Sequence, residues 1–313
     1  MRCWIFTSEK TMSGSLSQAE GLAQAIHTAP EVFYTSAYRP WRWLPIQLQP
    51  KYPWVFSCPK GPWPDILIAS GKGTIIPALA IKKANPETRV IYLQKPSAFS
   101  RSFDTIVMPT HDGTLPNAIN TLGAMHRASP SRIKEAIAHL PNSIKLAPSP
   151  TAAILIGGNA RAFKLDNKAT QDLITALKDW SEKHSITLIL LPSRRTPDHA
   201  IQSLSKAFSK TKHFLWDPST PSPYLGTLGI VDTFVITEES VSMASEAAST
   251  GKPIYLFPLT KKRRGKRIKS FQNALIDQGI ARWFNGKNEH WQYSLLNETE
   301  RIAKLITESL KTT

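Results

Sequence analysis

The residue types best suited to chemistry lie at residues 237–240, where Thr-Glu-Glu-Ser separates two ordered stretches. The apolar residues 234–236 predict a buried strand, and residues 241–250, rich in Ala, Ser and Met, predict a short helix. Gly251 ends that helix, and the apolar run 254–257 predicts the next strand. In a parallel sheet, the polar turn would lie at the carboxyl end of its strand, where open α/β folds bind ligands.

The turn at 237–240 offers a ligand two kinds of group. The exposed N–H groups at the start of the helix suit a phosphate. Glu246, one turn further on, could accept hydrogen bonds from sugar hydroxyls. The alternative interpretation fits the pattern equally well: a β–α–β unit with a polar cap that binds nothing.

Three other strand ends in the second half carry comparable turns. Gly157-Gly158 follows an apolar strand at 153–156, and Ser193-Arg194-Arg195-Thr196 follows another at 186–191. Trp216-Asp217 follows a shorter one. The carboxyl ends of parallel strands meet at one edge of the sheet, so the four turns together predict a nucleotide pocket.

The first half carries two polar turns of its own. Gly71-Lys72-Gly73 follows an apolar strand; its glycines would let a ligand approach the backbone, and Lys72 adds positive charge. The spacing is not that of a Walker motif, and a tight β–α turn without a ligand also explains it. His111-Asp112 follows a later strand, so the imidazole could act as a general base whose pKa the neighbouring carboxylate tunes. The alternative is a purely structural His-Asp pair.

These turns need a scaffold of alternating strands and helices, and both halves of the chain predict one. Each half repeats strand, small-residue turn, helix and strand, the pattern of a doubly wound domain. Ser17 with Glu20 predicts the first helix start by the capping-box rule. The loop before it lacks a dinucleotide fingerprint, so no tightly bound NAD is expected. Prolines at 141–150 predict a linker, which gives domains at 1–146 and 147–313.

Composition narrows the classes of partner. The 313 residues carry a net charge of +16, with 16 Lys and Arg against 8 Asp and Glu in residues 1–146, so both halves are basic. The positive electrostatic field of such a protein attracts anionic partners: nucleotides, nucleic acid or an acidic membrane face. Cys3 and Cys58 are the only cysteines, which excludes a disulfide framework and a Cys-based zinc site and fits a reducing cytosol. No apolar run approaches the roughly 20 residues of a membrane span.

Two further segments have a surface character. Residues 39–64 contain Trp41, Trp43, Trp54 and Trp63 among several prolines. They predict either a structured loop packed on the core or an exposed apolar edge that touches a membrane or a greasy acceptor. The run 261–269 holds the densest positive charge; it predicts either a solvated loop or a binding site for the phosphates of a lipid or an acceptor.

Several of these motifs together resemble a known family. The most specific is Thr-Glu-Glu-Ser-Val-Ser-Met-Ala-Ser-Glu-Ala at 237–247 with Thr-Gly-Lys-Pro at 250–253. Further matches are Ile156-Gly157-Gly158, Ala162-Phe163, Ser193–Pro197, Pro223–Gly226, Gln94, Pro96, Phe103-Asp104, Pro109, His111-Asp112 and Gly123–His126. The chain resembles the "elongated mitochondria" family, named for a plant mitochondrial fission factor, whose bacterial members are usually described as glycosyltransferases of the GT-B type.

The resemblance implies an α/β fold of two Rossmann-like domains facing a cleft (GT-B-like), with the last helix returning to the N-terminal domain. It places a sugar donor on the C-terminal domain, where Glu246 would hold the ribose hydroxyls and the two arginines the diphosphate. The donor-binding residues expected are Gly157, Gly158, Ser193, Arg194, Arg195, Thr196, Trp216, Tyr224, Thr237, Glu239, Ser240, Val241, Ser242, Met243 and Glu246.

The N-terminal domain would supply the base and the acceptor side. The base is expected to be His111 or Asp112, with Glu9 as the next candidate, and the acceptor or phosphate side to comprise Ser15, Gly71, Lys72, Gly73 and Lys95. Two segments depart from the family pattern. Residues 13–18 keep only part of a Gly-His and Asn-Gln pair, and Gly71-Lys72 replaces Gly-Arg, which retains the charge but loses the planar fork.

The function expected from the resemblance is metal-independent transfer of a sugar from a nucleotide-sugar to an acceptor, for example a cell-surface glycolipid. There is no Asp-x-Asp motif, and Glu238-Glu239 is the nearest candidate, so a metal-dependent GT-A mechanism is disfavoured and no bound cofactor is expected. The alternatives are a non-catalytic, membrane-associated or protein-recruiting fission factor and a nucleotide-sugar epimerase or hydrolase. Expected partners are a nucleotide-sugar and an anionic acceptor or membrane surface, not nucleic acid. The expected location is cytoplasmic, or peripheral on the inner face of the membrane.

Overall fold

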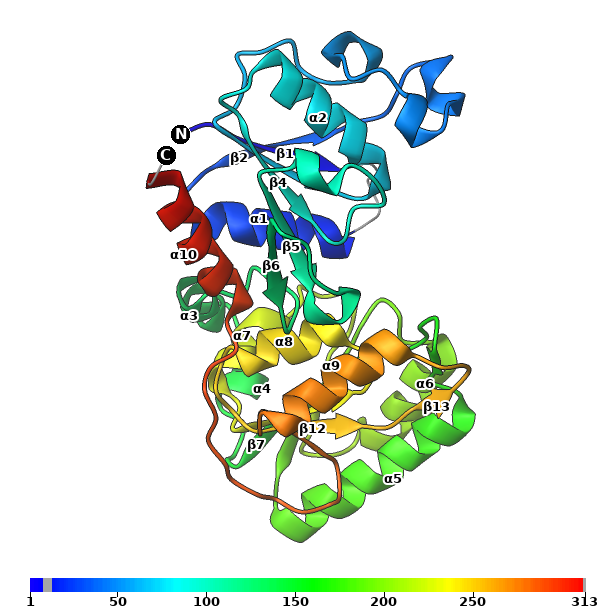
Figure 1. Ribbon diagram of the computed structural model, residues 1–313. Coiled ribbons are helices and arrows are strands. Elements are labelled where there is room, and N and C mark those ends of the chain that lie inside the picture. Colours follow the sequence, from blue (N-terminus) through cyan, green and yellow to red (C-terminus); the bar gives the residue numbers. More distant parts are fainter. Residues whose placement is uncertain (8–12, 312–313) are drawn as a thin grey trace. The chain divides into compact units, whose positions relative to one another are not determined.

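The computed structural model describes residues 1–7 and 13–311 and contains two compact units (Figure 1). Met1–Arg127 and Asn297–Thr313 form the first unit, and Ala128–Leu296 form the second. The division falls ahead of the boundary expected at 146/147, because helix α3 (Pro130–Ala138) packs on helix α7 (Tyr224–Ile230). The packing is close: a Cβ added to Gly226 of α7 would lie 2.7 Å from a carbonyl oxygen of α3.

The first unit is a parallel sheet with helices on both faces. Its strands follow the order β2-β1-β3-β4-β5-β6, in which the connections reverse direction between β1 and β3. The main elements are β1 (Cys3–Thr7), α1 (Ser13–Ala25), β2 (Pro30–Tyr34), β3 (Ile66–Ser70), α2 (Ile75–Ala84), β4 (Arg89–Leu93), β5 (Thr105–Pro109), β6 (Ala118–Thr121) and α10 (Glu298–Lys311). Short 3-10 helices are η1 (Trp41–Trp43), η2 (Ile46–Leu48), η3 (Pro53–Val55), η4 (Lys72–Thr74), η5 (Ser100–Ser102) and η6 (Thr110–Asp112).

Alternation along the strands divides the core of the first unit into two layers. Successive side chains of a strand point to opposite faces. Cys3 and Ile5 of β1 therefore pack with α1 and α10, whereas Trp4 and Phe6 pack with α2. Figure 1 shows α1 and α10 side by side on one face of the sheet and α2 on the other.

The second unit has the strand order β10-β9-β7-β11-β12-β14, again parallel throughout. This is the Rossmann order, with the reversal between β7 and β11. Its elements are α3, α4 (Asn142–Lys145), β7 (Thr151–Ile156), β8 (Phe163–Lys164), α5 (Asn167–His184), β9 (Thr187–Pro192), α6 (Asp198–Phe208), β10 (Phe214–Leu215), α7, β11 (Thr233–Thr237), α8 (Val241–Ala248), β12 (Ile254–Phe257), β13 (Thr260–Lys261), α9 (Lys266–Asp277) and β14 (Ala281–Trp283). The expected α/β class is confirmed.

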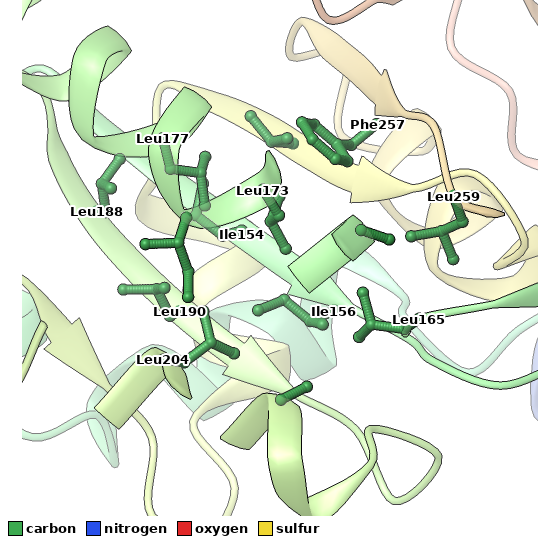
Figure 2. Packing of buried hydrophobic residues seen from close by; sticks show 14 of the residues in the cluster. Ile154, Ile156, Leu165, Leu173, Leu177, Leu188, Leu190, Leu204, Phe257 and Leu259 are labelled. Atoms are coloured by element: carbon green, nitrogen blue, oxygen red, sulfur yellow. The ribbon is translucent and has the colours of Figure 1, made fainter. Parts of the chain in front are cut away.

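A dense aliphatic core fixes the central strands of the second unit. Ile154 and Ile156 of β7 face the same side as Leu188 and Leu190 of β9, and helices α5 and α6 cover them (Figure 2). Phe257 and Leu259 extend this core beneath the end of β12. This packing fixes the positions of β7, β9 and β11 relative to one another, and so the positions of their carboxyl ends.

Three local features differ from the sequence expectations. Helix α1 begins at Ser13, so Ser17 lies inside it, and Glu20 pairs with Arg127 (Oε2 to Nη1, 2.6 Å) instead of closing a capping box. Helix α9 begins within the basic run 261–269, which is therefore only partly a loop. β8 and β13 form an antiparallel pair that no pattern predicted. Within residues 1–7 and 13–311, no helix combines the length and apolar composition that crossing a membrane demands.

Candidate functional site

Two of the predicted turns are in direct contact at the switch point of the second sheet, the place between β7 and β11 where the strand order reverses. Gly157-Gly158 follows β7, and Thr237–Ser240 starts at the last residue of the neighbouring strand β11. The N–H of Gly157 donates to Oγ1 of Thr237 (2.8 Å), and the N–H of Gly158 donates to Oε1 of Glu239 (2.7 Å). Open α/β sheets bind ligands at this position.

A third predicted turn, Ser193–Thr196 at the end of β9, closes on the same glycines. The hydroxyls of Ser193 and Thr196 both donate to the carbonyl oxygen of Gly157, at 2.8 and 2.7 Å. Ser193 Oγ also accepts from the N–H of Arg195 (3.2 Å). The hydroxyls of Ser193 and Thr196 therefore tie the backbone of this turn to Gly157. These bonds fix the position of the Arg195 backbone.

Little space surrounds either glycine, and Gly158 is sterically required. Gly158 has φ = 144°, and a Cβ there would lie 2.1 Å from the carbonyl oxygen of Arg195. A Cβ on Gly157 would lie 1.7 Å from Oε1 of Glu239. Contacts below 3.0 Å are essentially never seen for real Cβ atoms, so a side chain at Gly158 would have to displace backbone, whereas one at Gly157 would have to displace the carboxylate of Glu239.

Glu239 is a buried carboxylate at the centre of this contact. Its side chain is 0% exposed, and its Oε1 lies 3.5 Å from Nη2 of Arg195. Burial raises the pKa of Glu239, and the Gly158 N–H and the Arg195 charge oppose that rise only in part. Oε2 accepts no hydrogen bond from the described part of the chain. A charge kept buried at a net cost is typical of a functional site.

The N-terminus of α8 supplies a potential anion site beside Glu239. Ser240 is its N-cap residue, but its side chain makes no capping hydrogen bond. The first amide N–H groups, those of Val241, Ser242 and Met243, have no acceptor earlier in the helix. Arg195 reaches this end of the helix, since Nη2 lies 3.4 Å from Oγ of Ser240. Amides and guanidinium together form the arrangement that binds phosphate.

Glu246, one turn into α8, is held by Tyr224 of α7. The phenol Oη donates a short hydrogen bond to Oε2 of Glu246. Burial and the neighbouring carboxylate raise the pKa of Tyr224, so this phenol stays protonated and continues to donate. The role of Glu246 toward a ribose remains a prediction, and Tyr224 becomes the residue that orients the carboxylate.

The other residues expected to bind the donor lie further from Gly157-Gly158, which we call the glycine turn. Arg194 is exposed next to Arg195. Trp216 follows β10, which β9 separates from β7, and its Nε1 donates to the carbonyl of Thr220 (3.3 Å). The structure therefore groups Gly157, Gly158, Ser193, Arg195, Thr196, Thr237, Glu239 and Ser240 tightly, with Glu246 and Tyr224 as a second pair.

Two charged residues of the family motif have structural roles. Glu238 accepts from the N–H of Leu259 (2.8 Å) and from Nε2 of Gln272, so it ties β12 and α9 to the end of β11. Lys252 donates to the carbonyls of Leu228 and Gly229 at the end of α7 (3.1 and 2.7 Å). Burial lowers the pKa of Lys252 to about 8. Glu238 and Glu239 are adjacent in sequence but serve different partners.

The sequence patterns missed one neighbour of the glycine turn. β8 follows Gly158 closely and pairs with β13, so the N–H of Lys262 donates to the carbonyl of Ala162 (2.9 Å). Nε of Arg263 donates to the carbonyl of Arg161 (2.9 Å). The start of the basic run is thereby fixed next to the segment that leaves the glycine turn. Strands of two residues carry no periodic signal that could have predicted this.

The first unit presents its predicted residues at the carboxyl ends of its own strands. Lys95 Nζ donates to the carbonyl of Asp112 (2.8 Å), and Nε2 of His111 lies 3.9 Å from Oδ1 of Asp112, beyond hydrogen-bond distance. Gly71, with φ = 93°, precedes η4, which contains Lys72 and Gly73. Ser15 is buried in the first turn of α1. Glu9 lies outside the described residues.

Within the described residues, no group of three His, Cys, Asp or Glu side chains is arranged to hold a metal ion. The positive charge near the α8 N-terminus comes from Arg195 and the helix itself.

Two proteins of similar sequence give a first comparison. An Arabidopsis thaliana protein described as mitochondrial fission protein ELM1 is 29% identical over 280 residues, which cover 79% of this chain and 64% of that protein. The chain thus spans 64% of the length of this relative. A Rickettsia prowazekii (strain Madrid E) protein, described as uncharacterized protein RP120, is 25% identical, with 99% of both chains covered.

Solved structures share the fold at much lower identity. The UDP-GlcNAc 2-epimerase from Neisseria meningitidis bound to UDP-GlcNAc has a TM-score of 0.59 at 12% identity, with 100% of both chains covered. The Methanocaldococcus jannaschii UDP-GlcNAc 2-epimerase in complex with UDP-GlcNAc and UDP has a TM-score of 0.54 at 13% identity, covering 98% of this chain and 100% of that one. These likenesses establish a GT-B-like fold. The family model described as mitochondrial fission ELM1 matches residues 13–310, and the chain therefore belongs to the mitochondrial fission ELM1 family.

Proposed function

We propose that this protein is a glycosyltransferase that binds a nucleotide-sugar on its second unit. The observation that carries the proposal is the contact at the switch point, where the glycine turn, Arg195 and the uncapped start of α8 meet. The solved structures of the same fold that contain UDP-GlcNAc or UDP support a nucleotide-sugar as the ligand class. The residues around Gly157-Gly158 would hold the diphosphate, and Glu246 the ribose.

The chemistry that this site offers is stabilisation of a leaving group. When a sugar departs from its donor, negative charge builds on the nucleoside diphosphate, and preorganised donors lower the barrier most where that charge develops. Arg195 and the α8 amides would supply these donors, with Arg194 adding long-range attraction. In this proposal the chain's own cations, rather than a metal ion, neutralise the diphosphate.

The first unit would activate the acceptor hydroxyl. We propose His111 or Asp112 as the base, because both follow β5 at the carboxyl edge of their sheet. Lys95 would place Asp112 through its bond to the Asp112 carbonyl. Gly71, Lys72 and Gly73, after β3 at the same edge, would line the acceptor side.

A second candidate function is epimerisation of the nucleotide-sugar. It is favoured by the fact that the structures of the same fold quoted above are UDP-GlcNAc 2-epimerases. The two functions differ in their products. An epimerase or hydrolase alters the sugar without an acceptor, whereas a transferase releases nucleoside diphosphate only when an acceptor is present.

Nucleotide binding tests the shared part of both candidates. Calorimetric titration with UDP, GDP, ADP and CMP should identify one that binds, and Arg195→Ala should weaken it roughly 10- to 100-fold, the usual loss for a charged hydrogen bond. Arg282→Ala is the matched control: both arginines are 46% exposed and paired with a carboxylate, but Arg282 pairs with Glu289 away from the glycine turn. Absence of binding by all four nucleotides to the folded protein would refute the donor site and favour the non-catalytic recruiting factor.

Glu246→Ala tests the ribose contact separately. Loss of the carboxylate should lower the affinity for the nucleotide about tenfold, because two ribose hydroxyls would lose their hydrogen-bond acceptor. The comparison ligand is inorganic pyrophosphate, whose affinity should not change in the same variant. An unchanged nucleotide affinity would place the ribose elsewhere.

A further inference from the structure

The aromatic segment, residues 38–54 of the first unit, turns several large apolar side chains toward solvent. Trp43 is 71% exposed, and Trp54 and Leu48 are each 66% exposed. Tyr38 and Tyr52 are also exposed. In Figure 1 this segment forms the short blue turns next to α2. Clustered exposed aromatics on one segment indicate an interaction surface, since single exposed apolar residues are normal and a group of them is not.

The segment is anchored, so this exposure is not that of a loose loop. Trp41 and Ile46 pack against the core under α2, and the N–H of Tyr38 donates to the carbonyl of Val55 (2.9 Å). Trp54 stacks on Tyr52 (6.0 Å between ring centroids) and meets Trp41 edge-on (6.2 Å). One face of the segment therefore packs on the core, as one of the two expectations has it, and the other face is exposed; contact of that face with a membrane or an acceptor stays a prediction.

Positive charge surrounds the exposed rings. Residues 32–64 contain four Lys and Arg and no Asp or Glu. The guanidinium of Arg39 lies 5.5 Å from the ring centroid of Trp43, and Nζ of Lys83, from α2, lies 4.0 Å from that of Tyr52. Arg42, in η1 beside Trp43, is exposed as well. The cations lie around the same rings that would enter an apolar phase.

We propose that the aromatic segment docks the protein on an anionic lipid bilayer. Trp and Tyr side chains favour the membrane interface, where the ring is dry and its polar edge is hydrated. Lys and Arg near an anionic leaflet add about 1 kcal/mol each, a factor of about five in affinity. A protein partner would also cover the rings, but a surface of one charge sign without any acid over 33 residues complements a uniformly anionic lipid face best. This inference does not depend on the proposed nucleotide site.

The basic run 261–269 is the competing membrane surface. It carries more charge, but no large apolar side chain among its described residues is exposed. Charge without rings predicts weak, salt-sensitive attraction, whereas the aromatic segment can also bury apolar area in the headgroup region. The two surfaces can therefore be separated experimentally.

Sedimentation of the full-length protein with vesicles tests the proposal. The protein should bind vesicles of phosphatidylcholine with phosphatidylglycerol and not vesicles of phosphatidylcholine alone. Trp43→Ser with Trp54→Ser should weaken binding at least tenfold, because each ring buries on the order of 100 Å² of apolar area. Arg39→Gln, Arg42→Gln and Lys83→Gln together should weaken it about 100-fold.

Matched variants on the second unit are the controls. Trp283→Ser removes another exposed tryptophan (41% exposed), and Lys261→Gln with Lys262→Gln removes charge from the basic run. Both should bind like the wild type, and circular dichroism should show every variant folded. The proposal is overturned if the wild type ignores anionic vesicles or if only the basic-run variant loses binding. It is also overturned if the aromatic variants abolish self-association of the protein but leave vesicle binding intact.

Discussion

Gly158→Ala is the substitution that most directly tests the glycine turn. At φ = 144° the backbone of Gly158 is in a region that L-residues rarely adopt, and the new Cβ would lie 2.1 Å from the carbonyl oxygen of Arg195 and 2.9 Å from the Cα of Thr196. These neighbours are backbone atoms, so no side-chain rotation can make room. The turn Ser193–Thr196 would have to move by about 1.4 Å, since non-bonded heavy atoms separate by roughly 3.5 Å.

The expected cost combines two effects. A non-glycine residue in such a backbone conformation costs about 1–3 kcal/mol, and overpacking a close contact costs about 1–3 kcal/mol. Together they predict a loss of roughly 2–6 kcal/mol, which lowers the Tm of a unit of this size by roughly 5–20 °C. Arg195 would shift with the turn, so nucleotide affinity should fall as well.

Scanning calorimetry of Gly158→Ala beside Gly286→Ala separates the two effects. Gly286 also has positive φ (73°), but a Cβ there would meet no atom within 4 Å. The control should therefore show only the backbone cost, about 1–2 kcal/mol, and keep its nucleotide affinity. If Gly158→Ala melts within a degree or two of Gly286→Ala, the close approach of the two turns is not real in solution and the site geometry is wrong.

Two predictions concern pH. Burial lowers the pKa of His126 from 6.5 to about 4, and neither ring nitrogen has a hydrogen-bond partner in the described chain. The unfolded chain binds the extra proton, so about 3 kcal/mol of stability present above pH 6.5 should be lost by about pH 4. Denaturant titrations of His126→Leu should lack this part of the loss; an identical acid slope would contradict it. Burial raises the pKa of Glu239 above 4.5, so its ionisation costs stability as pH rises. Glu239→Gln keeps the Gly158 bond and should melt a few degrees above the wild type at neutral pH but not near pH 4.5; an equal Tm at both pH values would show that the carboxylate is not buried at a cost.

The sequence predicted most elements of both sheets because apolar strands, glycine stops and amphipathic helices are local patterns. The strand at 234–236, the stop at Gly251 and the strand at 254–257 all appear in the structure, each within a residue or two. The capping rule failed at Ser17, because α1 begins earlier and Glu20 pairs with Arg127, a residue 107 positions away. Local rules cannot account for such a distant partner.

The site was predicted as a set of strand ends, but not as a set of roles. Motif and spacing named Gly157, Gly158, Ser193, Arg195 and Glu239. They could not show that the hydroxyls of Ser193 and Thr196 and the carboxylate of Glu239 bond to backbone groups, or that Arg195 reaches the start of α8. Nor could they show that Glu239 bonds to Gly158 while Glu238 bonds to Leu259, since the partners of a buried side chain depend on tertiary packing.

The sequence by itself determined the fold class and named most residues of the candidate site. Two parallel α/β units, a basic surface and the family motifs all follow from patterns that neighbouring residues share. Only the tertiary structure decided which strands are adjacent, because the reversal between β7 and β11 places residues about 80 positions apart in hydrogen-bond contact. It also decided that Trp41 is packed while Trp43 is exposed, since two residues of the same type differ only in what the fold places against them.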